Sequence, residues 1–290
     1  MSKHERGILT SYDLRHSSTR IGYAIMVAAI LVMACTMIYP ILITFFNGVR
    51  PNTEMNSFPP RFFPSEWHFE NFGLGWNYIH LLLFLRNTFI IFAGNLIVTV
   101  AVLGLAAFSL THLNVPYRKQ IGAFFWITLF IPPTTYIIPN FMNLKELGLL
   151  NQFAAFWLPA AANAFYLLLL KNFFGGLHPE IFEAARMDGA SDGTCFFRIA
   201  FPLSVPIFAT LSIFIFSAVW NDWFWPSIVM HSDNGYPLAT AIYKYVLQAR
   251  RMNLNLRFAI LFMVMLPPVV VFLLFQKFIL RGVQLGGVKG

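Results

Sequence analysis

The chain has 290 residues, of which 58% are hydrophobic and only 11% charged, whereas soluble domains carry about 25% charged residues, so these figures exclude a soluble globular protein. A net charge of +8 would suit a nucleic-acid-binding protein, but the basic residues are scattered between apolar stretches, which favours orientation in a bilayer. The two cysteines, Cys35 and Cys195, predict neither a disulfide nor a metal site.

The first apolar stretch follows a polar tail, residues 1–20, that contains four basic residues. Residues 21–49 carry no charge and are long enough for one transmembrane helix. A cleaved signal peptide has an apolar region of only about 7–15 residues, so an uncleaved helix fits better. Residues 50–86 are rich in Pro, Phe and Trp, which predicts a loop that folds against the membrane face.

The next three apolar stretches predict three further spans, over residues 87–110, 121–141 and 152–170. The third span contains Pro132, Pro133 and Pro139, which free backbone carbonyls and permit kinks. We interpret them as ordinary membrane-helix prolines rather than as a gate for substrate.

A polar segment, His178–Pro202, separates the fourth and fifth apolar stretches. Pro179 suits the first position of a helix, Gly189 can end that helix with a positive φ, and Ser191 can cap a second short helix. The segment therefore predicts a helix–glycine–helix elbow, and we call residues 178–202 the elbow. It is either a connector on the lipid headgroups or a docking site for a cytosolic partner.

The last two spans are predicted over residues 206–230 and 258–278. The fifth contains the polar cluster Trp220-Asn221-Asp222-Trp223, which is either a functional site at membrane depth or an interfacial belt. With the amino terminus inside, 12 of the 20 lysines and arginines fall inside, a modest bias of the expected sign. The cluster of Arg250, Arg251 and Arg257 opposes this bias.

No catalytic pattern occurs in the chain. The phosphate-binding pattern G-x-x-x-x-G-K-[ST] is absent, as are H-E-x-x-H, C-x-x-C and G-x-S-x-G, and the seven histidines are dispersed. We therefore expect no catalytic, cofactor-binding or metal-binding residue, so a transport function would need an ion gradient or a separate ATPase.

The elbow also carries a family resemblance. Its run Glu183-Ala184-Ala185, followed by Asp188-Gly189-Ala190, resembles the EAA loop of ABC-transporter permease subunits. The fuller runs EAARMDGAS and FFRIAFPLSVP resemble the carbohydrate-importer branch related to the maltose permeases. The resemblance covers most of the chain and is strongest from Asn87 to Gly290.

The resemblance implies an all-α polytopic membrane protein with about six transmembrane helices and a cytoplasmic EAA coupling loop. The permease core would comprise residues 87–280, including the coupling loop 172–202, followed by a cytoplasmic tail, 281–290. The residues implied to dock on an ATPase are Glu183, Ala184, Ala185, Asp188 and Gly189. The candidates for the substrate path are Asn140, Asn163, Asn221 and Asp222.

The resemblance further implies a second permease subunit, an extracytoplasmic solute-binding protein, and two cytosolic ATPase subunits that bind ATP and Mg²⁺. The chain would lie in a bacterial or archaeal cytoplasmic membrane with both termini in the cytoplasm, and it would import a sugar or oligosaccharide.

Three alternatives stay open. The substrate could be a polyol or glycerol phosphate, because the cluster of Arg250, Arg251 and Arg257 could meet an anion. A gradient-driven secondary transporter would need buried carboxylates or an inverted repeat, and only Asp222 is a candidate carboxylate. A membrane scaffold without a pore is a third class, which the proline-broken span argues against.

Overall fold

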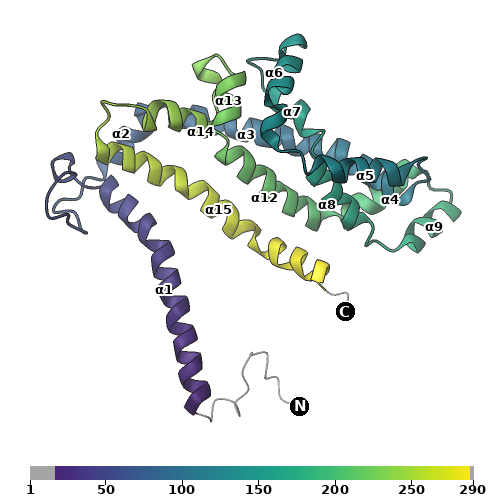
Figure 1. Ribbon diagram of the computed structural model, residues 1–290, viewed down its shortest axis with the longest axis horizontal. Coiled ribbons are helices and arrows are strands. Elements are labelled where there is room, and N and C mark those ends of the chain that lie inside the picture. The colour runs from purple at the N-terminus through teal and green to yellow at the C-terminus, as the bar shows by residue number, and fades with distance from the viewer. Residues whose placement is uncertain (1–16, 288–290) are drawn as a thin grey trace. The chain divides into compact units, whose positions relative to one another are not determined.

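The computed structural model of the protein describes residues 17–287, with side chains described as far as residue 276 (Figure 1). Every regular element in this range is a helix. The predicted all-α fold is therefore confirmed for these residues. Residues 1–16 of the predicted amino-terminal tail and 288–290 of the carboxy-terminal tail lie outside the described range.

The helices account for the predicted number of spans. Three single helices are long and apolar enough to cross a membrane, namely Ser17–Gly48, Leu81–His112 and Leu254–Gln276. Three further spans are pairs of helices that bend by 98°, 47° and 72° at a short break. Counting each bent pair as one span gives six among the described residues, as expected.

The described chain divides into two compact units, of which the first comprises residues 17–75 and 252–264. This unit contains α1 (Ser17–Gly48), η2 (Asn52–Glu54), most of α2 (Glu70–Tyr78) and the first turns of α15 (Leu254–Gly287). A Cβ atom on Gly48 would lie 3.0 Å from the backbone of Ala259, so α1 and α15 meet there backbone to backbone. Phe45 packs beside this contact against Phe262, with ring centroids 5.1 Å apart.

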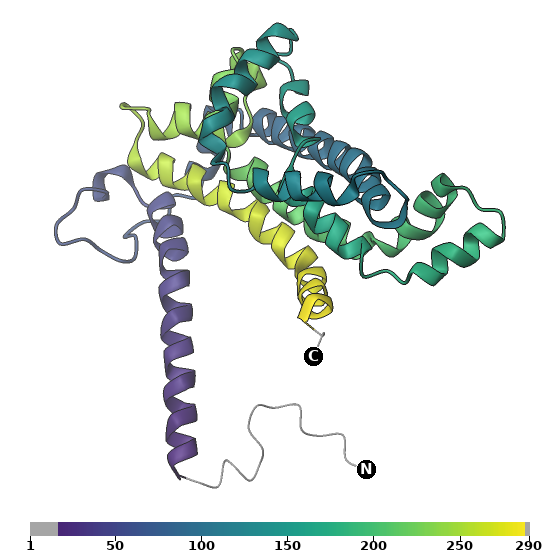
Figure 2. The same ribbon diagram turned by 45° about the vertical axis from the view of Figure 1, so that its right-hand side comes forward.

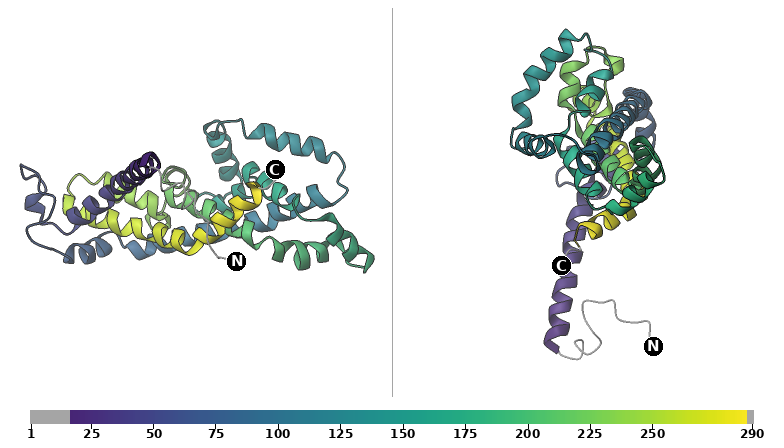
Figure 3. Two further views of the ribbon diagram at one scale, coloured as in Figure 1. Left: turned by 90° about the horizontal axis from the view of Figure 1, so that it is seen from below. Right: turned by 90° about the vertical axis from the view of Figure 1, so that its right-hand side faces the viewer.

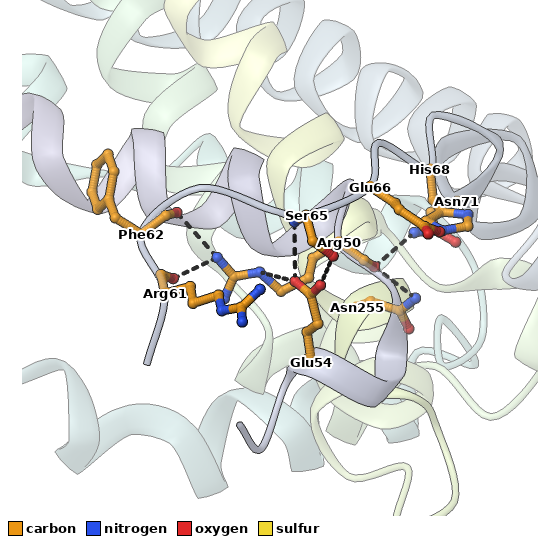
Figure 4. Close-up of polar contacts among 9 residues, drawn as sticks. All are labelled: Arg50, Glu54, Arg61, Phe62, Ser65, Glu66, His68, Asn71 and Asn255. Carbon is orange, nitrogen blue, oxygen red and sulfur yellow. Dashed lines mark hydrogen bonds and ion pairs between the residues drawn. The ribbon is translucent and has the colours of Figure 1, made fainter. Parts of the chain in front are cut away.

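Within this unit, Arg50 organises the loop of residues 49–69 (Figure 4). The residue is only 5% exposed, and its side chain donates hydrogen bonds to the backbone carbonyls of Arg61 (2.6 Å) and Phe62 (3.0 Å). Its Nε lies 3.6 Å from the carboxylate of Glu54, which in turn accepts from the backbone N–H of Ser65. The loop is therefore closed by its own polar groups.

The backbone of the same loop is held by two buried amides. Asn71 donates to the carbonyl of Gly48 (2.9 Å), and Asn255 donates to the carbonyl of Arg50 (3.1 Å) (Figure 4). These bonds satisfy carbonyls at the end of α1 that have no helical partner.

The second unit comprises residues 76–251 and 265–287. Its elements before the elbow are α3 (Leu81–Val98), η3 (Thr99–Leu103), α4 (Gly104–His112), α5 (Arg118–Thr128), η4 (Pro133–Tyr136), α6 (Ile137–Glu146), α7 (Ala154–Ala160) and α8 (Ala164–Phe174). The elbow and the chain after it form α9 (Pro179–Met187), α10 (Asp192–Thr194), η5 (Cys195–Ala200), α11 (Phe201–Leu203), α12 (Val205–Asn221), α13 (Phe224–Val229), η6 (Asp233–Gly235), α14 (Leu238–Ala241) and η7 (Ile242–Leu247). The elements η3, η5 and η7 are π-helical, whereas η2, η4 and η6 are 3₁₀ turns.

Several helix ends differ from the predicted ones. The first span is helical from Ser17, the first described residue, and so includes residues 17–20 ahead of the predicted start at residue 21. The second begins at Leu81 rather than residue 87, because the apolar run before Arg86 is helical and an Arg near a span end can extend toward water. The sixth begins at Leu254 rather than residue 258, and α15 continues through Pro267 and Pro268.

Two predicted spans break or end where the sequence predicted no break. The fourth is split into α7 and α8 at Asn163, and the fifth ends at Asn221 rather than residue 230, where α13 follows as a separate helix. The third span has a bend of the kind that its prolines permit, since Pro132 and Pro133 lie at the 98° bend between α5 and α6.

Candidate functional site

The elbow adopts the helix–glycine–helix structure that its sequence predicts. The residue His178 is extended and Pro179 occupies the first turn of α9. Gly189 follows with φ = +83°, a conformation that costs other L-residues free energy. The backbone N–H of Ala190 then donates to the carbonyl of Ala185 at 2.9 Å, which satisfies a free carbonyl of the last helical turn.

The second half of the elbow begins at Ser191. Its Oγ accepts a hydrogen bond from the backbone N–H of Thr194 at 3.2 Å, as the sequence predicts for a helix cap. The chain continues through η5, whose Cys195 and Phe196 are buried. A 72° bend at Ser204 then leads into α12.

One face of α9 is open to solvent. Of the five predicted docking residues, Glu183, Ala184, Asp188 and Gly189 are exposed, whereas Ala185 is half-buried and faces the body of the unit. Beside Ala184 lie two apolar side chains that sequence reasoning missed, Ile181 (42% exposed) and Met187 (89% exposed). Their spacing of three residues from Ala184 on either side places all three on one face of the helix, and this spacing could have identified them.

The opposite face of α9 is anchored. Phe182 is fully buried, with its ring centroid 5.5 Å from that of Phe108 and 4.3 Å from that of His112. Arg186 donates to the backbone carbonyl of His112 (3.2 Å) and pairs with Asp192 (3.2 Å). The elbow is therefore held on one side and free on the other.

Within the second unit, α9 lies at one end (Figures 1 and 2, right). The left-hand view of Figure 3 again shows α9 at that end. The helices α6 and α13 stand together elsewhere in the unit, at the top of Figure 1.

A second feature of this unit is a cavity of about 380 Å³, a size that lies within the range of small-molecule sites. Three of the four predicted path residues line this cavity: Asn140 on α6, Asn163 before α8, and Asp222 after α12. Asn221 does not line the cavity, because its side chain is exposed and donates to the carbonyl of Ser217 in its own helix.

Two of the lining residues lie at breaks in the spans. Asn163 Oδ1 accepts from the backbone N–H of Tyr166 (3.0 Å) at the start of α8, and Asp222 Oδ1 accepts from that of Trp225 (3.0 Å) at the start of α13. Both side chains satisfy N–H groups that a helix start leaves free. Broken spans thus bring polar groups to the cavity wall.

Sequence reasoning missed two further polar residues of the cavity wall, Asn95 and Thr99. Thr99 is fully buried, and neither its Oγ1 nor the Oδ1 of Asn95 has a hydrogen-bond partner among the residues that the structure describes. Their spacing of four residues on one face of an apolar span was an available signal. Both atoms are buried without a partner, which is unfavourable, so this part of the wall carries unsatisfied hydrogen-bonding capacity.

The cavity wall is mostly apolar, with a few polar and aromatic side chains and little charge. Tyr136, Tyr166 and Trp225 contribute rings, and Asp222 is the one charged residue among those that line the cavity. No Lys, Arg or His belongs to this lining, so the wall offers an anion no ion-pairing partner.

Comparison with known proteins gives one family match. The model of the family described as "Binding-protein-dependent transport system inner membrane component" matches residues 101–285, which include the elbow and most of the cavity wall.

Individual relatives match over most of their lengths. The probable ABC transporter permease protein YurM of Bacillus subtilis is 31% identical, over 78% of this chain and 76% of the relative. The melibiose/raffinose/stachyose import permease protein MelC of the same organism is 30% identical, over 89% and 94%. The sn-glycerol-3-phosphate permease protein UgpE of Pectobacterium atrosepticum is 28% identical, over 85% and 90%.

A solved structure shares the fold. A bacterial ABC transporter involved in the import of the acidic polysaccharide alginate contains a chain that superposes with a TM-score of 0.81. The superposition covers 90% of this chain and 98% of that chain, at 23% identity.

Proposed function

The chain belongs to the family of binding-protein-dependent transport system inner membrane components, and on this premise we propose that it is one permease subunit of an ATP-driven importer of a neutral sugar or oligosaccharide. The family inferred from the sequence is confirmed by this match. In the proposed assembly a solute-binding protein delivers the sugar outside the membrane, and a second permease subunit completes the path.

The observation that carries the proposal is the free face of the elbow. Ile181, Ala184 and Met187 form an apolar ridge next to the carboxylates of Glu180 and Asp188, and all five residues are exposed. An apolar helix face of this kind suits a groove on another protein. Since the chain has no phosphate-binding pattern, the partner would be an ATPase subunit that binds ATP and Mg²⁺ itself.

The five predicted docking residues then have distinct roles. Ala184 would admit the partner's backbone closely, Glu183 and Asp188 would offer it carboxylates, and Gly189 would set the angle of the elbow. Ala185 would act indirectly, because it is half-buried. Two such elbows, one from each permease subunit, would serve two ATPase subunits on the cytoplasmic side, where both termini also lie in this proposal.

The cavity favours a neutral substrate over a phosphate. Amide, hydroxyl and aromatic side chains are suited to the hydroxyl groups and apolar faces of a sugar ring. A glycerol phosphate would face Asp222 with no cation from this lining to compensate. The family includes permeases for both substrate classes, since MelC is named for oligosaccharides and UgpE for glycerol phosphate, and the charge of the wall supports the first class over the second.

The gradient-driven alternative rested on Asp222. That carboxylate caps α13 by accepting from the N–H of Trp225, which gives it a structural role without proton transfer. The structure therefore offers no separate argument for a proton relay at this residue.

The test is reconstitution with the products of neighbouring genes. The purified complex in liposomes should hydrolyse ATP, and a binding protein loaded with a neutral oligosaccharide should stimulate hydrolysis and uptake, whereas sn-glycerol-3-phosphate should not. A chain that purifies without an ATPase, with uptake that collapses when the ion gradient is dissipated, would refute the proposal. Stimulation by sn-glycerol-3-phosphate alone would refute the substrate class only.

The cavity is tested with a matched pair of variants. Asn163→Ala removes a polar group from the wall and a helix cap, and should lower uptake at least tenfold. Asn221→Ala removes the same amide one span away and outside the lining, and should leave uptake near wild type. Equal effects of the two variants would argue against the cavity as the substrate path.

A further inference from the structure

The anchored face of the elbow contacts α4 at Phe108 and at His112, and His112 is the last residue of that helix. The ring of Phe182 packs on the imidazole with centroids 4.3 Å apart, and the guanidinium of Arg186 donates to the His112 carbonyl at 3.2 Å. Both contacts come from α9, one turn apart. The helix α9 therefore contacts both the side chain and the backbone carbonyl of the residue that ends α4.

His112 also joins α4 to α8. Its Nε2 lies 2.9 Å from the carbonyl oxygen of Phe174, the last residue of α8, and donates a hydrogen bond to that oxygen. Phe108, one turn earlier on α4, packs edge-on against the ring of Phe174, with centroids 6.0 Å apart. Three helices, α4, α8 and α9, therefore meet at one imidazole.

The far ends of α4 and α8 lie at the cavity. The helix α4 is preceded without a break by η3 and α3, in which Thr99 and Asn95, respectively, line the cavity wall. The helix α8 begins next to Asn163, and Tyr166 lies in its first turn; both residues line the same wall. At 1.5 Å per residue the cavity end of α8 is about 16 Å from Phe174, a span that one rigid helix can bridge.

We propose that His112 is a positioning residue that ties the elbow to the two cavity-lining helices, so that a displacement of α9 moves the cavity wall. The proposal rests on the proposed function, in which an ATPase displaces the elbow. It assigns the transmission to two discrete contacts, the imidazole of His112 and the guanidinium of Arg186, and not to the packing of the unit as a whole.

The contacts distinguish transmission from docking. Phe182, Arg186 and His112 lie on the anchored face or behind it, whereas the proposed docking residues other than Ala185 are exposed. A change at His112 should therefore leave ATPase binding intact and lower the amount of sugar moved for each ATP hydrolysed. A change at Ala184 should instead weaken ATPase binding.

The experiment uses the reconstituted complex and measures sugar uptake and ATP hydrolysis in the same liposomes. His112→Ala and Arg186→Gln should each lower the uptake per ATP at least fivefold, with the ATPase still bound, and Arg186→Lys, which retains a donor, should recover part of it. The matched controls are His178→Ala and Arg198→Gln, whose side chains are exposed and which belong to the same elbow.

The outcomes separate the two proposals. Wild-type complex without ATPase activity or uptake would refute the proposed function. A functional wild type in which Arg186→Gln keeps the wild-type uptake per ATP would refute the role of this junction. So would a His112→Ala variant that folds, binds the ATPase and stays coupled. If His112→Ala does not fold, Arg186→Gln decides the question, because its exposed side chain is not part of the core.

Discussion

Two polar segments of this chain lie next to apolar spans but use their polar groups differently. In the loop of residues 49–69, Arg50 is buried. Its guanidinium donates hydrogen bonds to two backbone carbonyls and forms an ion pair with Glu54. In the elbow, α9 is anchored on one face only, and Met187 on the other face is 89% exposed. The loop is closed by its own contacts, whereas the elbow leaves a surface to be covered.

The difference indicates what each segment is for. A buried cation with several hydrogen bonds favours one loop conformation, and removing it deprives the part-buried carbonyls of Arg61 and Phe62 of their donor. An exposed apolar ridge does nothing for the isolated chain and becomes useful only when a partner covers it. Substitutions in the loop should therefore change stability, and those on the free face of the elbow should change coupling.

The largest expected effect is that of Arg50→Ala. The carbonyls of Arg61 and Phe62 would lose their donor and Glu54 its counter-ion, so we expect a loss of about 3 kcal/mol in the free energy of unfolding. Denaturant unfolding in detergent measures this loss. Arg61→Ala is the matched control, since that side chain is exposed and only its backbone carbonyl accepts from Arg50, and it should cost under about 0.5 kcal/mol.

On the free face of the elbow, Ala184→Trp should lower function without lowering stability. An indole at this exposed position would keep a partner's groove at a distance, so we expect ATPase affinity and uptake to fall at least tenfold, about 1.4 kcal/mol, with unfolding unchanged. Ala184→Ser keeps a small side chain and should behave as wild type. Wild-type uptake by Ala184→Trp would contradict the docking assignment.

The substitution Gly189→Ala should have a smaller effect, on the free energy of unfolding. A Cβ atom there would meet nothing within 4 Å, so Gly189→Ala tests backbone strain alone at φ = +83°. We expect a cost of about 1 kcal/mol, measured by thermal unfolding. Gly193→Ala, in α10 and without a positive φ, is the matched control and should be neutral or slightly stabilising. A cost that is equal in both variants would exclude the positive φ as the cause.

The parts of this structure that follow from the sequence are those built by near neighbours. Pro179, Gly189 and Ser191 define the elbow through contacts within a few residues, so the pattern was sufficient to predict its helices and its turn. The number of spans also follows, because apolar length alone determines it. Their ends do not, as the start at Leu81 shows, since an Arg near a span end is compatible with a continuing helix.

The cavity depends on residues far apart in the chain and was only partly predictable. Asn163 and Asp222 were candidates as isolated polar residues. The helix breaks beside them could not be predicted, because the apolar pattern continues on either side of each break. Asn95 and Thr99 line a cavity only because segments distant in sequence form the rest of its wall. Asn221 was a candidate because it adjoins Asp222 in sequence, but it does not line the cavity. It lies on a helix, and its side chain donates a hydrogen bond to the carbonyl of Ser217 in the preceding turn.

The smallest expected effect concerns a surface pair beside the loop. His68 Nδ1 lies 2.5 Å from Glu70 Oε1, and Glu66 lies 3.4 Å from the other ring nitrogen. The hydrogen bond to the Glu70 carboxylate raises the pKa of His68 above its ordinary 6.5 and lowers the pKa of Glu70 below its ordinary 4.5. The histidine therefore contributes stability that is complete below about pH 6.5 and is lost as pH rises through its raised pKa.

Glu70 has the opposite sign: its contribution is complete above about pH 4.5 and is lost as pH falls through its lowered pKa. The difference in melting temperature between wild type and Glu70→Gln should thus be greatest near pH 5–6 and vanish toward pH 9, and salt should reduce it because the pair is exposed. Glu180→Gln, which removes the 3.9 Å contact with His178 on the elbow, should change less. A difference for Glu70→Gln that persists at pH 9 would mean that Glu70 stabilises the loop without the charge on His68.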